Sequence, residues 1–186
     1  MHDNLDTYQS GKRARIGDPD KVKVAAPALV LIDPKYPHNV GAAVRAASCF
    51  GVRQIWYTGD RVPIEAEAGY RLPREERMRG YKDVDLYQFD EPLSVIRRAT
   101  PVAVEVRDNA ERLPDFEHPD NAVYVFGPED GSIPSAVLAL CHRFVIVPTR
   151  HCLNLGAAIN VMLYDRCLKR GFPEDSGWRS NYGTGS

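Results

Sequence analysis

Short, uniformly apolar segments recur along the chain, and segments with helical spacing separate them. The clearest apolar runs are residues 28–32 (Ala-Leu-Val-Leu-Ile), 122–126 (Ala-Val-Tyr-Val-Phe) and 144–147 (Phe-Val-Ile-Val). Continuous apolar runs of this length are typical of strands that are buried on both faces of a sheet. Because such strands alternate with helices, the sequence predicts an α/β fold with a mostly parallel sheet flanked by helices.

Further strands are expected at residues 54–58, 84–89 and 102–106, and helices at residues 39–50, 92–98 and 133–141. Asn39 is a favourable N-cap for the first of these helices, and Gly51 suits the left-handed position after its end. A last helix, closed by Gly171, is indicated by apolar residues that recur on one face. These residues are Leu153, Ala157, Val161, Tyr164 and Leu168.

A chain of 186 residues is most simply one domain, and we place that domain at residues 27–172. Residues 1–26 are polar and without periodicity, and residues 173–186 are rich in glycine and serine, so both are expected to be flexible tails. No apolar run reaches the roughly 18–20 residues that span a bilayer, and the N-terminus lacks the pattern of a signal sequence. The expected location is therefore the cytoplasm, with no membrane partner.

The four cysteines, Cys49, Cys141, Cys152 and Cys167, lie far apart and form no Cys-x-x-Cys pair. This spacing argues against a disulfide framework and against a zinc site, so no metal is expected. Cys49 and Cys167 fall in helical patterns and are expected to be small buried residues. The formal net charge of −1 argues against a surface that is basic all over, although it allows a local basic patch.

Three short motifs follow expected strands along the chain. They are Asn-Val-Gly-Ala-Ala-Val-Arg at 39–45, Phe-Gly-Pro-Glu-Asp-Gly-Ser-Ile-Pro at 126–134 and Cys-Leu-Asn-Leu-Gly-Ala-Ala-Ile-Asn at 152–160. In open α/β sheets, ligands bind outside the carboxyl ends of the strands, so the three motifs are expected to share one site. The sequence contains neither a Gly-x-Gly-x-x-Gly motif nor a P-loop. The tight turn at 127–131 instead offers backbone groups that suit an uncharged purine edge.

In this order and spacing, the three motifs resemble those of the SPOUT superfamily of RNA methyltransferases, in its SpoU/TrmH branch. The resemblance covers residues 28–171 and rests on Asn39, Gly41, Arg45, residues 126–131, Pro148, Leu153 and Asn154. It implies a deep trefoil knot at the C-terminus, S-adenosyl-L-methionine bound in the knot, and a homodimer. The implied reaction is methylation of a ribose 2′-hydroxyl in RNA. Small members of this branch typically act on tRNA, so tRNA is the expected RNA partner.

The resemblance also implies roles for individual residues. Arg45 would act on the ribose hydroxyl, while Asn39, Glu129 and Asn154 would hold Arg45 and the loops in place. Because a guanidinium is always protonated, orienting the phosphate and ribose is a safer role for Arg45 than that of a base. The residues expected at the cofactor are Val104, Glu105, Gly127, Gly131, Val147, Cys152 and Leu153. Those expected to contact RNA are Arg45, His38, Arg71 and Arg74.

Each of these residues also has a purely structural interpretation. Arg45 on a helix can be a surface ion-pair residue, Glu129 can belong to turn chemistry, and Asn154 can be only the N-cap of the last helix. His151 is interpreted as a solvated loop histidine. The arginines from Arg61 to Arg79 either bind an RNA backbone or lie in an exposed loop of mixed charge, because glutamates are interleaved with them.

Cys152 departs from the family's motif, in which serine commonly precedes Leu-Asn. A thiol is a weaker hydrogen-bond donor and acceptor than a hydroxyl, so this departure bears on how the acceptor is positioned. This departure favours one alternative, a non-catalytic RNA-binding or assembly protein that kept the fold. Methylation of rRNA at the 2′-hydroxyl, in place of tRNA, is another alternative that stays open. A nucleotide-dependent enzyme that acts on small molecules is disfavoured, because no phosphate loop is present.

Overall fold

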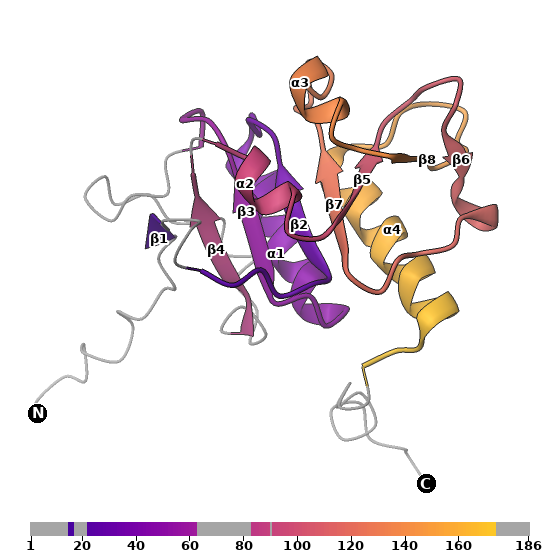
Figure 1. Cartoon of the computed structure of the whole chain (residues 1–186), viewed down its shortest axis with the longest axis horizontal. Coiled ribbons are helices and arrows are strands. Elements are labelled where there is room, and N and C mark those ends of the chain that lie inside the picture. Colours follow the sequence, from indigo (N-terminus) through magenta and orange to yellow (C-terminus); the bar gives the residue numbers. More distant parts are fainter. Residues whose placement is uncertain (1–14, 17–21, 63–82, 90, 174–186) are drawn as a thin grey trace, which may run out of the picture.

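The chain folds around an eight-stranded sheet, seen in a computed structural model that describes residues 15–16, 22–62, 83–89 and 91–173 (Figure 1). The strands are β1 (Arg15–Ile16), β2 (Ala28–Leu31), β3 (Gln54–Tyr57), β4 (Asp85–Gln88), β5 (Thr100–Val104), β6 (Glu111–Arg112), β7 (Ala122–Phe126) and β8 (Arg143–Ile146). Their order in the sheet is β1-β4-β3-β2-β7-β5-β8-β6, and each of these neighbouring pairs is parallel. The expected α/β class with a mostly parallel sheet is confirmed.

Helices cover both faces of this sheet. They are α1 (Pro37–Cys49), α2 (Leu93–Ile96), α3 (Ser135–Leu138) and α4 (Leu155–Arg170), together with the short 3-10 helix η5 (Leu113–Asp115). Apolar residues of α1 and α4 pack in one core cluster with Leu29 and Leu31, whereas those of α2 and α3 pack in a second cluster with Val30. Alternate residues of β2 thus face opposite layers, as the pleat requires, which explains why the whole strand is apolar.

The two helices on the first face approach each other closely. A Cβ added at Gly156 of α4 would lie only 2.8 Å from the Cβ of Ala42 in α1. A side chain at this position would therefore push the two helices apart. The small residues of the first and third sequence motifs thus set the distance between α1 and α4.

Helix α1 begins two residues earlier than expected. Its N-cap is Tyr36 and its first residue is Pro37, whose missing N–H costs nothing at this position. Asn39 is therefore not the N-cap but a residue of the first turn, with only 4% of its surface exposed. The expected helix end is close to correct, because Phe50 is the C-cap and Gly51 adopts a positive φ of 75°.

Helix α4 is capped at both ends by the residues that the sequence indicates. The Asn154 side chain is its N-cap and accepts a hydrogen bond from the Ala157 N–H at 2.7 Å. Gly171 follows its last residue with a φ of 97°. The N-cap interpretation of Asn154 is therefore confirmed.

The apolar residues whose spacing predicts α4 are not the ones that pack on the sheet. Val161, Tyr164 and Leu168 are 39%, 52% and 62% exposed. The face that packs on the sheet consists instead of Leu155, Gly156, Ile159, Met162, Leu163 and Cys167. Helix α4 thus has two apolar faces, and the one identified from the sequence is open to solvent in the single chain.

A buried histidine fixes α4 against the segment that follows η5. His118 is 4% exposed, and its ring nitrogens lie 2.6 Å from the hydroxyl of Tyr124 in β7 and 2.8 Å from a carboxylate oxygen of Asp165 in α4. Burial lowers the pKa of His118 below its ordinary value and outweighs the opposite effect of Asp165. Burial likewise raises the pKa of Tyr124 to about 12, so its phenol stays protonated.

Several local expectations were wrong. The expected tail at residues 1–26 contains β1, which pairs with β4, and Ala25 N–H donates to the Gln54 side chain at 2.8 Å. The strand expected at 102–106 is shifted toward the N-terminus in β5, and the helix expected at 133–141 is only the short α3. Cys49 is exposed, whereas Cys167 is buried as expected. Cys49 lies in the last turn of α1, beyond the residues that face α4 and the sheet.

Candidate functional site

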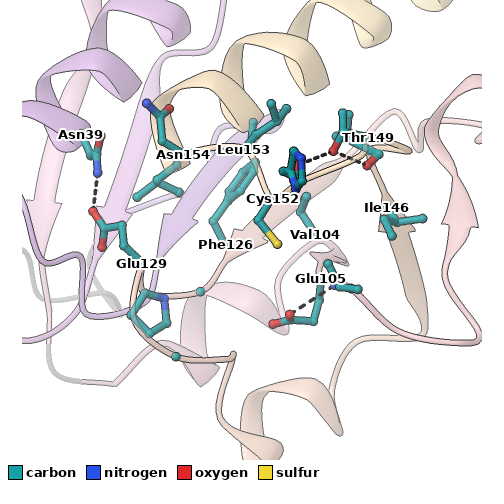
Figure 2. A pocket seen from close by; sticks show the side chains of 18 of the residues that line it. Asn39, Val104, Glu105, Phe126, Glu129, Ile146, Thr149, Cys152, Leu153 and Asn154 are labelled. Carbon is teal, nitrogen blue, oxygen red and sulfur yellow. Dashed lines mark hydrogen bonds between the residues drawn. The ribbon is translucent and has the colours of Figure 1, made fainter.

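A cavity of about 960 Å³ opens at the carboxyl edge of the sheet (Figure 2). It is lined by the segments that follow β2, β5, β7 and β8, so four neighbouring strands of the sheet end at this cavity. Because all these strands are parallel, the loops after them meet on one side of the sheet. The three sequence motifs thus contribute to one site.

The cavity gathers most of the residues that the sequence analysis assigned to a site. Those that line it are His38, Asn39, Val104, Glu105, Gly127, Glu129, Gly131, Val147, Cys152, Leu153 and Asn154. Arg45 does not line the cavity and lies exposed on α1, more than one helical turn beyond Asn39. Arg71 and Arg74 lie outside the described residues.

Glu129 joins the first and second motifs. Its Oε1 accepts a hydrogen bond from the Asn39 side-chain amide at 2.5 Å, and its Oε2 accepts one from the Lys35 backbone N–H at 2.8 Å. Figure 2 shows the two side chains of Asn39 and Glu129 pointing toward one another. Burial alone would raise the pKa of Glu129, but these hydrogen bonds outweigh it and lower the pKa below the ordinary value. The carboxylate is therefore ionised and acts as a fixed acceptor.

A second set of contacts, made by Asp130 of the second motif, also holds the turn at 127–131. Asp130 pairs with Arg61 at 2.9 Å and with Lys35 at 3.1 Å, and Arg61 also pairs with Asp33 at 3.0 Å. The hydrogen bond from Arg61, followed by the one from Lys35, lowers the pKa of Asp130. These residues connect the loops after β2, β3 and β7, so the position of Glu129 depends on both sets of contacts.

The close approach of Asp33 requires a glycine opposite it. A Cβ added at Gly59 would lie 2.1 Å from Oδ1 of Asp33, and Gly59 has a φ of 78°. Asp33 itself has a positive φ of 44°, which a short polar residue tolerates better than a bulky one. The positive φ of Asp33 and the missing side chain of Gly59 thus allow the loop after β2 to turn sharply next to the cavity.

Glu105 ties the end of β5 to the loop after β7. Its Oε2 accepts a hydrogen bond from the Ile133 backbone N–H at 3.1 Å, and its Oε1 accepts one from the Val106 N–H at 3.2 Å. A Cβ added at Gly127 would lie 3.1 Å from the Ile133 nitrogen, so the turn at 127–131 closes tightly on itself. Glu105 therefore shapes the cavity wall through the protein backbone.

The loop before α4 forms the remaining wall. The Thr149 hydroxyl donates to the His151 carbonyl at 2.7 Å, which folds this loop back on itself. The next residues along the loop are Cys152, Leu153 and Asn154. All three are exposed, and all three line the cavity (Figure 2). His151 is exposed as expected and also lines the cavity.

Sequence reasoning missed Tyr36, Lys35 and Arg61. Tyr36 lines the cavity, while Lys35 and Arg61 hold Asp130. For Lys35 and Tyr36, the sequence offers one indication, which is that they lie between the first expected strand and Asn39 of the first motif. Arg61 was part of an arginine-rich loop, and nothing in its spacing distinguished it from the other arginines.

Two searches of the described residues found no candidates. No group of three or more histidine, cysteine, aspartate or glutamate side chains is arranged to hold a metal ion there. Within the same residues, no helix has the length and apolar character needed to cross a membrane.

Comparison with protein families gives one match over most of the chain. A model of the SpoU rRNA Methylase family matches residues 26–164. The chain is 26% identical over 159 residues to a tRNA (cytidine-2′-O-)-methyltransferase, TrmJ, of Methanocaldococcus jannaschii, covering 76% of this chain and 67% of that protein. It is 27% identical over 150 residues to an uncharacterised tRNA/rRNA methyltransferase of Synechocystis, covering 74% of this chain and 51% of that protein. The chain thus spans between half and two thirds of these relatives.

Solved structures share the fold. The TrmH/SpoU tRNA modifying enzyme of A. aeolicus superposes with a TM-score of 0.65 at 19% identity, covering 82% of this chain and 78% of that one. The SpoU methyltransferase AviRb of Streptomyces viridochromogenes, solved in complex with AdoMet, superposes with a TM-score of 0.67 at 18% identity, covering 82% and 62%. At these identities the likeness establishes the fold.

Proposed function

The chain belongs to the SpoU rRNA Methylase family, whose members use S-adenosylmethionine, and on this basis we propose that it methylates RNA at a ribose 2′-hydroxyl. The observation that carries the proposal is the convergence of the three motifs at one cavity. Residues far apart in the sequence meet there at the carboxyl ends of parallel strands, which is where α/β enzymes bind their ligands. The TrmJ relative supports the ribose hydroxyl as the acceptor.

The cavity suits a cofactor of the size and chemistry of S-adenosylmethionine. Its volume lies near the upper end of the roughly 300–1,000 Å³ of ligand pockets. Val104, Phe126 and Leu153 offer apolar surface for a purine ring, and the turn at 127–131 offers backbone groups for its edge. Gly131, Val147 and Cys152 also line the cavity. When bound, the cofactor supplies a methyl group that is activated by the positive charge of a sulfonium.

Glu105 holds this wall in place. Both of its carboxylate oxygens accept backbone N–H groups, so it keeps the loops after β5 and β7 together. We assign Glu105 to the shape of the cofactor site and not to the chemistry. Gly127 has the same role, because its lack of a side chain lets the turn close against Ile133.

Arg45 is proposed to orient the RNA. A guanidinium binds a phosphate bidentately and stays charged at physiological pH, so it can hold the phosphate next to the reacting ribose. The exposed position of Arg45 on α1 suits a ligand that arrives from solvent. The hydroxyl proton then passes to the RNA phosphate that Arg45 orients, and from there to solvent. Holding the hydroxyl close to the methyl group lowers the barrier through positioning, without a change in charge on the protein.

Asn39, Glu129 and Asn154 are proposed to position this machinery. Asn39 sits in the first turn of the helix that carries Arg45, and its hydrogen bond to Glu129 fixes that helix against the cofactor loop. Asn154 caps α4 and fixes the loop that carries Cys152 and Leu153. His38 lies beside Asn39 at the cavity and is proposed to contact the RNA, as are Arg71 and Arg74.

A homodimer is proposed as the working form, built on the exposed face of α4. Val161, Tyr164, Leu168 and Phe172 repeat along this helix and its end, and Leu168 is the most exposed of them at 62%. The ring of Tyr164 lies edge-on to those of Phe50 and Phe172, at centroid distances of 6.3 and 5.8 Å. A second copy of the chain would cover this apolar surface.

Among RNAs, tRNA is the proposed substrate, with rRNA as the second candidate because the family description names it. The test incubates the protein with labelled S-adenosylmethionine and either total tRNA or rRNA, followed by mass spectrometry of the nucleosides. A 2′-O-methylated nucleoside from tRNA supports the proposal and identifies the base. Label only in rRNA would favour the second candidate. The cytoplasm stays the expected location for either RNA.

A non-catalytic RNA-binding protein with the same fold is the rival interpretation. Cys152, which stands where serine is common in the family, is the feature that favours it. Binding of S-adenosylmethionine together with methyl transfer is the observation that discriminates, because a protein that only binds RNA transfers no methyl group. Absence of both cofactor binding and methyl transfer would contradict the proposed enzyme.

A further inference from the structure

Tyr36 forms an aromatic surface at the rim of the cavity. Its side chain lines the cavity, and 43% of its surface is exposed. The ring is stacked with that of His38, with centroids 5.3 Å apart and an interplanar angle of 22°. Both residues are exposed, so the two rings present a stacked aromatic surface at the cavity rim.

The backbone holds this surface at a fixed place relative to the site. Tyr36 is the N-cap of α1, and its carbonyl accepts a hydrogen bond from the Asn39 N–H at 3.0 Å. Pro37 follows and restricts the backbone between the two rings. Because Asn39 is bound to Glu129, the backbone that carries Tyr36 and His38 is joined to the turn after β7.

The charges around the pair include cations that can meet a phosphate, next to carboxylates. The ammonium of Lys35 lies 5.4 Å from the centroid of the Tyr36 ring and pairs with Asp130 at 3.1 Å, and Arg150 lines the same cavity as Glu129. The hydrogen bond and the charge of Asp130 raise the pKa of Lys35, so its ammonium is charged throughout the physiological range. An exposed aromatic surface beside cations is the combination that binds single-stranded nucleic acid, in which bases stack on rings and phosphates meet positive charge.

We propose that Tyr36, stacked on His38, binds an unpaired nucleobase of the RNA substrate next to the reacting nucleotide. This inference rests on the proposed function and adds how the RNA is held. It means that the target lies in a loop, a bulge or another single-stranded segment, because a base inside a duplex has no free face to stack. A regular double helix would be a poor substrate for the same reason.

The test compares Tyr36→Leu, which keeps an apolar side chain but removes the ring, with Tyr36→Phe, which keeps the ring. Affinity is measured with single-stranded RNA oligonucleotides that carry 2-aminopurine, whose fluorescence is quenched when it stacks on a ring, and with total tRNA. Tyr36→Phe is expected to bind RNA about tenfold more tightly than Tyr36→Leu, and only Tyr36→Phe should quench the probe. In methyl transfer, Tyr36→Leu should raise KM for RNA more than it lowers kcat.

Three outcomes would overturn the proposal. Equal RNA affinity of Tyr36→Leu and Tyr36→Phe would show that the ring does not stack on a base. Weaker binding of S-adenosylmethionine to Tyr36→Leu would make the ring a cofactor contact, and a changed oligomeric state would make it a subunit contact. Because RNA binding is read without methyl transfer, ring-dependent binding without any transfer would support the stacking site while contradicting the proposed reaction.

Discussion

Asn39 and Glu129 lie 90 residues apart in the sequence, yet the side-chain nitrogen of Asn39 lies 2.5 Å from a carboxylate oxygen of Glu129. This contact joins the helix that carries Arg45 to the turn that follows β7. Hydrogen bonds to a charged acceptor contribute about 1.5–3 kcal/mol when they are partly buried. The contact therefore contributes to stability and also sets the relative position of the first two motifs.

Removing either partner of this contact is expected to destabilise the fold by about 1–3 kcal/mol, because the other is left without its hydrogen bond. Denaturant unfolding of Asn39→Ala, Glu129→Ala and the double variant should show a coupling of at least about 0.5 kcal/mol. Thr100→Ala is the control, because Thr100 makes a 2.7 Å hydrogen bond to Asn121 that is exposed and lies far from the cavity. If the losses of unfolding free energy from the two single substitutions simply added in the double variant, the two side chains would not be energetically coupled and the prediction would be wrong.

Arg45→Ala is expected to lower methyl transfer by at least about 100-fold, since misplacing the reacting groups has an effect of this size. Stability and S-adenosylmethionine binding should stay near wild type, because the side chain is exposed on α1 and does not line the cavity. Arg53→Ala is the matched control. Arg53 is also an exposed arginine, but it precedes β3 and so lies at the amino ends of the strands, opposite the cavity. Wild-type activity in Arg45→Ala would contradict the proposed role of Arg45 in orienting the RNA.

Cys152→Ser is expected to leave methyl transfer unchanged or to raise it modestly. A hydroxyl forms stronger hydrogen bonds than a thiol, and Cys152 is exposed, so the smaller side chain leaves no buried void. The measurement is kcat and KM for both cofactor and RNA. A loss of activity greater than about tenfold would mean that the thiol itself takes part in binding or in the reaction.

Stability is expected to fall as the pH drops below about 6.5, because His118 is buried in its neutral form. The pKa of His118 is lowered in the folded protein, so His118 is neutral in both the folded and the unfolded chain above this pH. Just below it, only the unfolded chain binds a proton at His118, and this binding favours unfolding. The loss of stability is complete once the pH is below the pKa of His118 in the folded protein. Thermal unfolding between about pH 5 and 8 should show a weaker pH dependence for His118→Gln than for wild type. Parallel curves would contradict this origin.

Leu168→Glu is expected to convert the proposed dimer into a monomer. Leu168 is the most exposed large apolar residue of α4, and a charge there would be buried without a partner in the interface. Light scattering after size-exclusion chromatography gives the mass directly. A substitution at the neighbouring Lys169 is the control for the dimer, because the Lys169 ammonium donates to the carbonyls of Leu113 and Phe116 within the same chain and is not part of the exposed apolar face. A wild-type protein that is monomeric at micromolar concentration would contradict the proposal.

The sequence predicted the elements whose burial leaves a clear pattern. β7 was placed correctly to the residue, because it is covered on both faces and every one of its side chains must be apolar. The caps of α4 were also correct, since Asn154 and Gly171 meet local backbone requirements. The convergence of the three motifs followed from the parallel sheet.

Contacts between distant segments left no such pattern. Asn39 looked like an N-cap because its type suits that position, but its amide is used by Glu129, which only the folded chain brings near. Spacing identified the apolar residues of α4 but could not separate the face that packs on the sheet from the face left open. The stacking of Tyr36 on His38 likewise depends on where α1 begins.

The position of the methyl group on the RNA product distinguishes methylation of the ribose from methylation of a base. RNA labelled by the protein from S-adenosylmethionine is hydrolysed with alkali, in which the 2′-hydroxyl attacks the neighbouring phosphate and cleaves the chain. A methylated 2′-oxygen cannot attack, so the account predicts label in alkali-resistant dinucleotides, and none with Arg45→Ala. Label in mononucleotides would place the methyl on a base and contradict the proposed reaction.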